Sequence, residues 1–91
     1  MFKNADKILE KLGFEKVNSD SEYGANYRRK DKKYGYIQAL DIVYKESGKH
    51  LIQSYVEGVN SEGFSNCVGL TYPEMKAAMK KYLELKRKYK W

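Results

Sequence analysis

The densest group of basic side chains in the sequence lies at residues 28–33, which read Arg28-Arg29-Lys30-Asp31-Lys32-Lys33. Five of these six residues are basic, and tyrosines flank them at positions 27, 34 and 36. Arginine binds phosphate through two parallel hydrogen bonds, and a tyrosine ring can stack on a nucleobase. The pattern therefore predicts a surface for an anionic partner, with nucleic acid as the leading hypothesis. The residues expected to make this contact are Arg28, Arg29, Lys30, Lys32, Lys33, Tyr34 and Tyr36.

A second group of basic residues lies in the last part of the chain. Residues 71–91 contain seven Lys or Arg against Glu74 and Glu84, and they contribute most of the formal net charge of +6. On a helical wheel these charges spread around a solvent-exposed face, and Glu84 can pair with lysines three or four residues away. We therefore expect this group to act only as a supporting patch for an anionic partner.

Residues that could catalyse a reaction or bind a metal are few. His50 and Cys67 are the single histidine and the single cysteine, so the sequence offers neither a Cys/His metal cluster nor an internal disulfide. No Gly-rich phosphate loop or nucleophile motif appears. Asp41 lies in the middle of a predicted strand, where a carboxylate must be paired or hydrogen-bonded, and Ser54 is expected opposite it. We predict a non-enzymatic binding module with no catalytic residue, metal, cofactor or small-molecule substrate.

Length and composition predict one small domain spanning residues 1–91. The first residues contain no apolar stretch of the kind found in signal peptides. No run of about 18 apolar residues occurs, so no membrane span or membrane partner is expected. A lone cysteine fits a reducing compartment, and a cytoplasmic location is predicted.

Two segments predict helices. Residues 4–13 combine apolar residues at helical spacing with Asn4 as an N-cap and Gly13 as a residue that ends the helix. The second helix begins at a capping box in which the Thr71 and Glu74 side chains bond each other's backbone N–H groups. Its expected buried stripe is Met75, Ala78, Met79, Tyr82, Leu85 and Tyr89.

Alternating apolar and polar residues predict three strands, while residues 14–17 are expected to form only a short extended piece. The strands are expected at about 22–28, 34–45 and 50–56. The fold class is therefore α+β in the order α-β-β-β-α, with a three-stranded antiparallel meander packed by a short N-terminal and a long C-terminal helix. A fourth short strand near Cys67–Leu70 is the alternative to a plain connection there.

Side-chain alternation places six of the nine tyrosines on one face of this sheet if the turns centre on Asp31-Lys32 and Ser47-Gly48. Two interpretations stay open. The helices could cover this face and bury the rings, or they could cover the opposite aliphatic face. In the second case the tyrosines form a stacking platform for single-stranded nucleic acid. The six residues are Tyr23, Tyr27, Tyr34, Tyr36, Tyr44 and Tyr55.

The order of elements resembles that of two groups of nucleic-acid-binding domains. It is similar to double-stranded RNA-binding domains, although Glu74 stands where their helix start carries phosphate-binding lysines. It also resembles the arm-type DNA-binding domains of phage and transposon integrases, which lay a basic sheet in the major groove. The segments that carry this second resemblance are Tyr27-Arg28-Arg29, Lys33-Tyr34-Gly35-Tyr36 and the helix start at 70–82.

In composition the chain is rich in Lys and Tyr and contains one Pro. In this it resembles small uncharacterised proteins encoded by phages and prophages of AT-rich Gram-positive bacteria. The resemblance implies an accessory role in which the protein binds a host or phage component. The alternative to nucleic acid is therefore a protein–protein accessory factor, including a homodimer, whose charge serves solubility.

Overall fold

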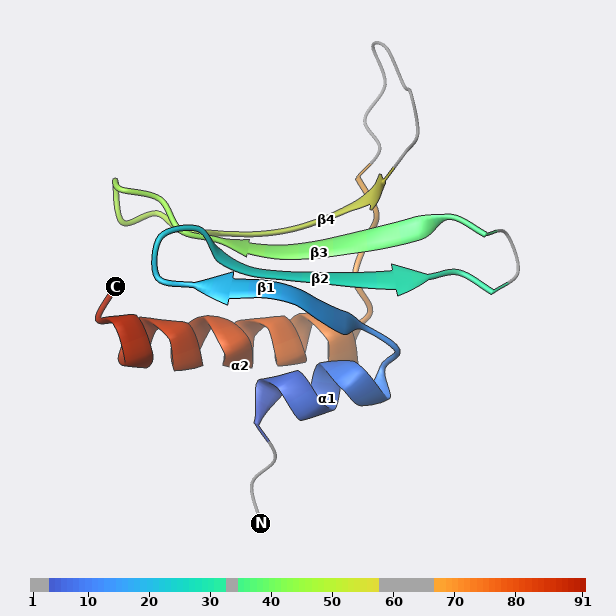
Figure 1. Ribbon diagram of the computed structural model, residues 1–91, viewed down its shortest axis with the longest axis horizontal. Coiled ribbons are helices and arrows are strands. Elements are labelled where there is room, and N and C mark those ends of the chain that lie inside the picture. Colours follow the sequence, from blue (N-terminus) through green and yellow to red (C-terminus); the bar gives the residue numbers. More distant parts are fainter. Residues whose placement is uncertain (1–3, 33–34, 58–66) are drawn as a thin grey trace, which may run out of the picture.

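The computed structural model describes residues 4–32, 35–57 and 67–91, and their fold is α+β. A short N-terminal helix precedes a four-stranded antiparallel meander in the order β1-β2-β3-β4, and a long C-terminal helix packs against the first helix (Figure 1). The predicted fold class is confirmed. The elements are α1 (Ala5–Lys11), β1 (Glu15–Asp20), β2 (Gly24–Lys30), β3 (Ile37–Val43), β4 (Leu51–Glu57) and α2 (Tyr72–Tyr89).

The fourth strand lies at the start of the sheet and not near residue 67. The segment predicted as a short extended piece continues as β1, which pairs with β2 from Glu15 opposite Arg28 to Asp20 opposite Gly24. A register shift between Lys16 and Asn18 interrupts the alternation of β1, which explains why its sequence did not read as a strand. Cys67 forms only an isolated bridge to β4.

The register between β3 and β4 differs by one residue from the predicted one. Tyr55 lies opposite Ala39 instead of Leu40, so its side chain points to the other face of the sheet. Between β2 and β3 the observed register differs from the predicted one by an even number of residues. Tyr27, which lies opposite Leu40, therefore keeps its predicted face. The predicted face of six tyrosines is therefore wrong, and one of its members, Tyr34, lies outside the described residues.

Both helices lie on the same side of the sheet (Figure 1). We call the face toward them the inner face and the opposite one the outer face. Tyr27 is buried in the inner face together with Leu40 and Ile42, as the burial interpretation required for this ring. The core cluster comprises Leu9, Phe14, Ala25, Tyr27, Leu40, Ile42, Ala77, Ala78 and Leu85.

Local capping explains where the two helices begin. The Asn4 side chain accepts a hydrogen bond from the Lys7 N–H over 2.9 Å. At the start of α2 the Thr71 N–H donates to Glu74 Oε1 over 2.9 Å, and Thr71 Oγ1 accepts from the Glu74 N–H over 3.3 Å. These hydrogen bonds confirm both predicted caps. Each cap satisfies N–H groups that have no partner within the helix.

The buried face of α2 is rotated relative to the predicted stripe. Met75 and Met79 were expected in the core, yet they are 39% and 53% exposed. Lys81 takes a place in the buried face instead, and its ammonium lies 3.1 Å from the Asp6 carboxylate of α1. The two small residues Ala77 and Ala78 are also buried, which is consistent with close packing of the helix in the core. None of the described helices is long and apolar enough to cross a membrane.

Candidate interaction surfaces

The first arginine of the predicted basic cluster is paired on the outer face of the sheet. Arg28 donates to Asp41 Oδ1 and to Glu57 Oε1, each over 2.9 Å. It also donates to the backbone carbonyl of Tyr27 over 2.8 Å. The guanidinium is thus engaged by two carboxylates and a carbonyl of its own chain, and its charge is locally neutralised.

The Asp41 carboxylate is the centre of this outer-face network. It accepts hydrogen bonds from the Asn26 amide over 2.9 Å and from the Tyr55 hydroxyl over 2.8 Å, besides the Arg28 contact. Desolvation raises the pKa of Asp41, but these hydrogen bonds and the nearby guanidinium outweigh it, so the pKa lies below its ordinary value. The predicted need for partners is confirmed.

The prediction that Ser54 lies opposite Asp41 is wrong, however. The one-residue register change places Gln53 opposite Asp41, while Ser54 turns to the inner face. There Ser54 Oγ accepts a hydrogen bond from the Gln38 side chain over 2.8 Å.

The second arginine points to the inner face. Arg29 lies 2.6 Å from the Glu74 carboxylate and donates to the Leu12 carbonyl over 2.9 Å and to Gln38 Oε1 over 2.7 Å. Its guanidinium carbon lies 4.3 Å from the centroid of the Phe14 ring. The two adjacent arginines therefore face opposite sides of the sheet and do not share one basic surface.

Two lysines of the predicted cluster remain exposed beside a pocket of about 390 Å³. Lys30 and Lys32 line it together with Lys11 from the last turn of α1. Sequence reasoning missed Lys11, although the helix end predicted at Gly13 already brings this last turn close to the strand that follows. Lys33 and Tyr34 lie outside the described residues, and Tyr36 is exposed directly before β3. We call this surface the basic pocket; its lining is Lys11, Leu12, Gly13, Arg29, Lys30, Asp31 and Lys32.

A second surface lies along α2. Four large apolar side chains project from this helix into solvent at helical spacing, with exposed fractions between 39% and 75%. Monomeric proteins rarely leave several such side chains exposed side by side. We call these residues the α2 stripe: Tyr72, Met75, Met79 and Leu83.

The α2 stripe borders a pocket of about 380 Å³ on the side of the helix nearest β4. Met79 and Leu83 form one wall, and Ile52 from the inner face of β4 forms another. The remaining lining residues of this α2–β4 pocket are His50 and Tyr82. The first helix, α1, packs on the other flank of α2, where Glu84 accepts the Ala5 N–H over 2.9 Å.

Aromatic rings support one end of the α2–β4 pocket. The His50 ring stacks on Tyr44 with centroids 5.0 Å apart and lies 4.8 Å from the Trp91 ring. Tyr82 lies 5.9 Å from His50, and the His50 Nδ1 accepts the Lys45 N–H over 3.0 Å. The ring of His50 is therefore held in place by packing on several sides and by a backbone hydrogen bond.

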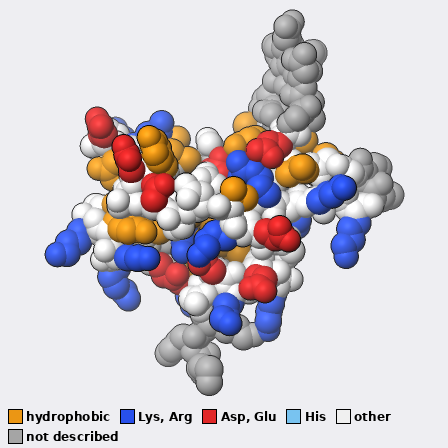
Figure 2. Space-filling view, viewed as in Figure 1, with side chains coloured by type: hydrophobic (Ala, Val, Ile, Leu, Met, Phe, Trp, Pro, Cys, Tyr) orange, Lys and Arg blue, Asp and Glu red, His pale blue; other side chains and the backbone are white. Residues whose placement is uncertain are grey.

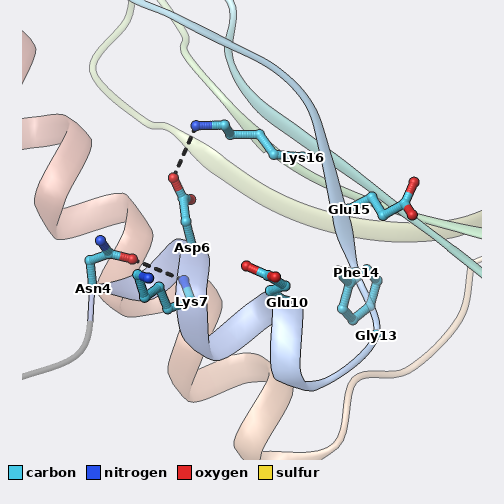
Figure 3. Close-up of a pocket in the computed structure, with 8 residues that line it drawn as sticks. All are labelled: Asn4, Asp6, Lys7, Glu10, Gly13, Phe14, Glu15 and Lys16. Carbon is cyan, nitrogen blue, oxygen red and sulfur yellow. Dashed lines mark hydrogen bonds and ion pairs between the residues drawn. The ribbon is translucent and has the colours of Figure 1, made fainter.

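A third pocket, of about 560 Å³, lies beside α1 and the start of β1 (Figure 3). The Asp6 carboxylate points toward the Lys16 ammonium, 3.1 Å away, and it also accepts a hydrogen bond from the Tyr27 hydroxyl. The eight lining residues include no cysteine, histidine or hydroxyl side chain that could serve as a nucleophile or its base.

On the face drawn in Figure 2, acidic and basic side chains are interspersed.

Metal binding and relatives give no further assignment. Within the described ranges, no group of three or more His, Cys, Asp or Glu side chains is arranged to hold a metal ion. No family model, curated protein or solved structure matches the chain.

Proposed function

We propose that this chain is a non-enzymatic protein-binding module, and that it binds through the α2 stripe and the adjoining α2–β4 pocket. The observation that carries the proposal is the exposure of Met79 and Leu83, which are 53% and 56% accessible beside a pocket lined mostly by apolar and aromatic side chains. Methionine and tyrosine are enriched at protein interfaces, and removing such side chains from water favours association. The role as an accessory protein of a phage or prophage stays a prediction.

The internal pairing of Arg28 and Arg29 also favours this function over the leading hypothesis from sequence. Both guanidinium groups would have to leave carboxylates of their own chain before they could bind phosphate. Breaking such partly buried pairs is unfavourable, because it leaves carboxylates without their partners. The α2 stripe needs no such rearrangement.

Selection of ligands from a random peptide library, with the whole chain as the target, tests the proposal. Selected peptides are expected to shift the NMR signals of residues 75–83 and to lose binding to Met79→Asp and Leu83→Asp variants. Val17→Asp is the matched control, since Val17 is 62% exposed on β1 at the opposite edge of the sheet. A selection without binders, or binders that tolerate both α2 substitutions, would refute the assignment.

Nucleic acid binding is the second candidate, and the basic pocket favours it. Lys11 from the end of α1 lines this pocket together with Lys30 and Lys32 from the end of β2 and the residues just beyond it, although Lys11 is far from the other two in the sequence. With about three phosphate contacts, the logarithm of the affinity would fall against the logarithm of salt with a slope of about −2.7. That slope corresponds to a loss of about 40-fold between ~50 and ~200 mM salt.

Titration with labelled single- and double-stranded DNA and RNA tests this candidate at both salt concentrations. A Lys30→Glu/Lys32→Glu variant should lose binding, whereas Lys86→Glu/Lys88→Glu, with the same change in charge on α2, should retain most of it. Absence of binding at the lower salt concentration excludes the candidate.

A further inference from the structure

We infer that the partner bound by the α2 stripe is an acidic amphipathic helical segment of another protein. This inference rests on the proposed function and adds the chemistry of the partner. Its basis is the charge around the stripe. The exposed positions of α2 include four basic residues and no acidic one, namely Lys76, Lys86, Arg87 and Lys88, and the C-cap residue Lys90 is exposed as well.

The two glutamates of α2 do not offset this charge at the stripe. Glu74 is buried at the first turn and lies 2.6 Å from Arg29. Glu84 faces α1, where its carboxylate accepts the Ala5 N–H. Among the described residues of α2, the exposed charged side chains that flank the apolar stripe are therefore all basic.

The spacing of these residues defines two parallel lines along the helix. Met75, Met79 and Leu83 follow one another at four-residue steps and form the apolar line. Lys76 and Lys80 lie on the adjacent line, one residue beyond Met75 and Met79, and Arg87 is the next four-residue step after Leu83. A partner helix with an apolar stripe and carboxylates along one flank would match both lines.

Length and shape favour a helical segment with one bulky anchor. From Tyr72 to Leu83 the stripe extends about 16 Å, which corresponds to three helical turns of a partner. The α2–β4 pocket, at about 380 Å³, can take an apolar side chain that protrudes from such a segment. A lipid surface carries no protruding group that would fill this pocket.

A second copy of the chain fits less well than an acidic partner. Two α2 stripes packed face to face would bring Lys76 and Arg87 of each copy close to the basic residues of the other. Like charges next to each other oppose association, and none of the exposed residues of α2 is acidic. The charge pattern thus selects a partner of opposite sign.

The peptides selected in the library experiment above provide the first test. They are expected to be enriched in Asp and Glu and to carry apolar residues at helical spacing. Replacing their carboxylates by amides should weaken binding about tenfold at ~50 mM salt, since exposed ion pairs contribute about threefold each and two or three are expected. The difference should shrink as salt increases.

Charge reversal provides the second test. A Lys76→Glu/Arg87→Glu variant should reject the acidic peptides and accept versions with Lys in place of Glu. The matched control is Lys30→Glu/Lys32→Glu, which changes the net charge equally at the hairpin and should leave peptide affinity unchanged.

The possible outcomes separate the inference from the proposed function. Peptides that bind at α2 without a preference for acidic residues would overturn the inference and leave the proposed function intact. A library that yields no binder overturns both. Binding to anionic phospholipid vesicles that Leu83→Asp abolishes would assign the surface to a membrane instead. A dimer in sedimentation that Leu83→Asp dissociates would assign it to a second copy.

Discussion

Arg29 in β2 and Glu74 in the first turn of α2 form an ion pair of 2.6 Å. The same guanidinium binds the carbonyl of Leu12 at the end of α1 and lies against the Phe14 ring. One side chain thus connects the sheet, the end of the first helix and the beginning of the last. A residue that the sequence suggested as a phosphate ligand has a structural role here.

The substitution Glu74→Gln should lower the free energy of unfolding by about 2 kcal/mol, because the Arg29 guanidinium loses its charged partner in a mostly buried site. Glutamine can still complete the capping box, so the start of α2 is preserved. Urea denaturation followed by circular dichroism measures the effect. Glu46→Gln, at an exposed position, is the control, and an equal effect of both substitutions would contradict the structural role of the pair.

Acid should destabilise the protein through three carboxylates. For Asp6, Asp41 and Glu74, desolvation raises the pKa, but hydrogen bonds and neighbouring cations lower it by a larger amount. Each folded-state pKa therefore lies below its ordinary value. A lowered pKa contributes stability above the unfolded value of about 4, and that contribution is lost as the pH falls through the folded value.

Urea midpoints measured from pH 7 down to pH 2.5 should therefore stay level at first and then fall below about pH 4. An Asp41→Asn variant should be less stable at pH 7 and should show a shallower acid decline, because one of the three groups no longer titrates. Parallel curves for the variant and the parent chain would show that Asp41 has the same pKa in the folded and unfolded states.

Gly24 should be the least replaceable of the described glycines. Its φ is +100°, and a Cβ atom at this position would lie 1.9 Å from the carbonyl oxygen of Ile42 in β3. Gly48, at φ +86°, has no atom within 4 Å of the corresponding position. Both alanine variants carry the left-handed backbone penalty of about 1–2 kcal/mol, but Gly24→Ala must also push β2 away from β3. Thermal unfolding should show a loss at least about 2 kcal/mol larger for Gly24→Ala, and equal losses would contradict this strand contact.

Truncation of α2 side chains distinguishes the observed helix face from the predicted one. Leu85→Ala should reduce stability by about 2–5 kcal/mol, because Leu85 is 1% exposed and a cavity would remain. Met79→Ala should change it by less than about 0.5 kcal/mol, as expected of an exposed residue. Comparable losses in urea denaturation would instead place Met79 in the core.

Sequence patterns predicted the features that depend on neighbouring residues. Asn4, Thr71 and Glu74 fixed where the helices begin, because a cap needs only the next three or four residues. The turn at Ser47-Gly48 was found for the same reason, and Gly48 has the expected positive φ. The α+β class and the antiparallel meander followed from these local signals.

Features that depend on distant residues were not predictable in this way. The one-residue shift that turns Tyr55 to the outer face depends on the pairing of two whole strands. The burial of Lys81 depends on Asp6, a carboxylate in another helix that no local pattern connects to it. With Lys81 turned inward, Met79 is turned outward, and the α2 stripe could therefore not be seen in the sequence.

The docking of α1 on α2 has a consequence for folding during synthesis. Ala5 bonds Glu84 across a separation of 79 residues, and Asp6 pairs with Lys81. Each strand pairs with the strand next to it in the chain, so the sheet can assemble while the ribosome is still adding residues. Leu9 and the inner face stay in contact with water until α2 emerges, and during that interval the nascent chain presents its future core to chaperones.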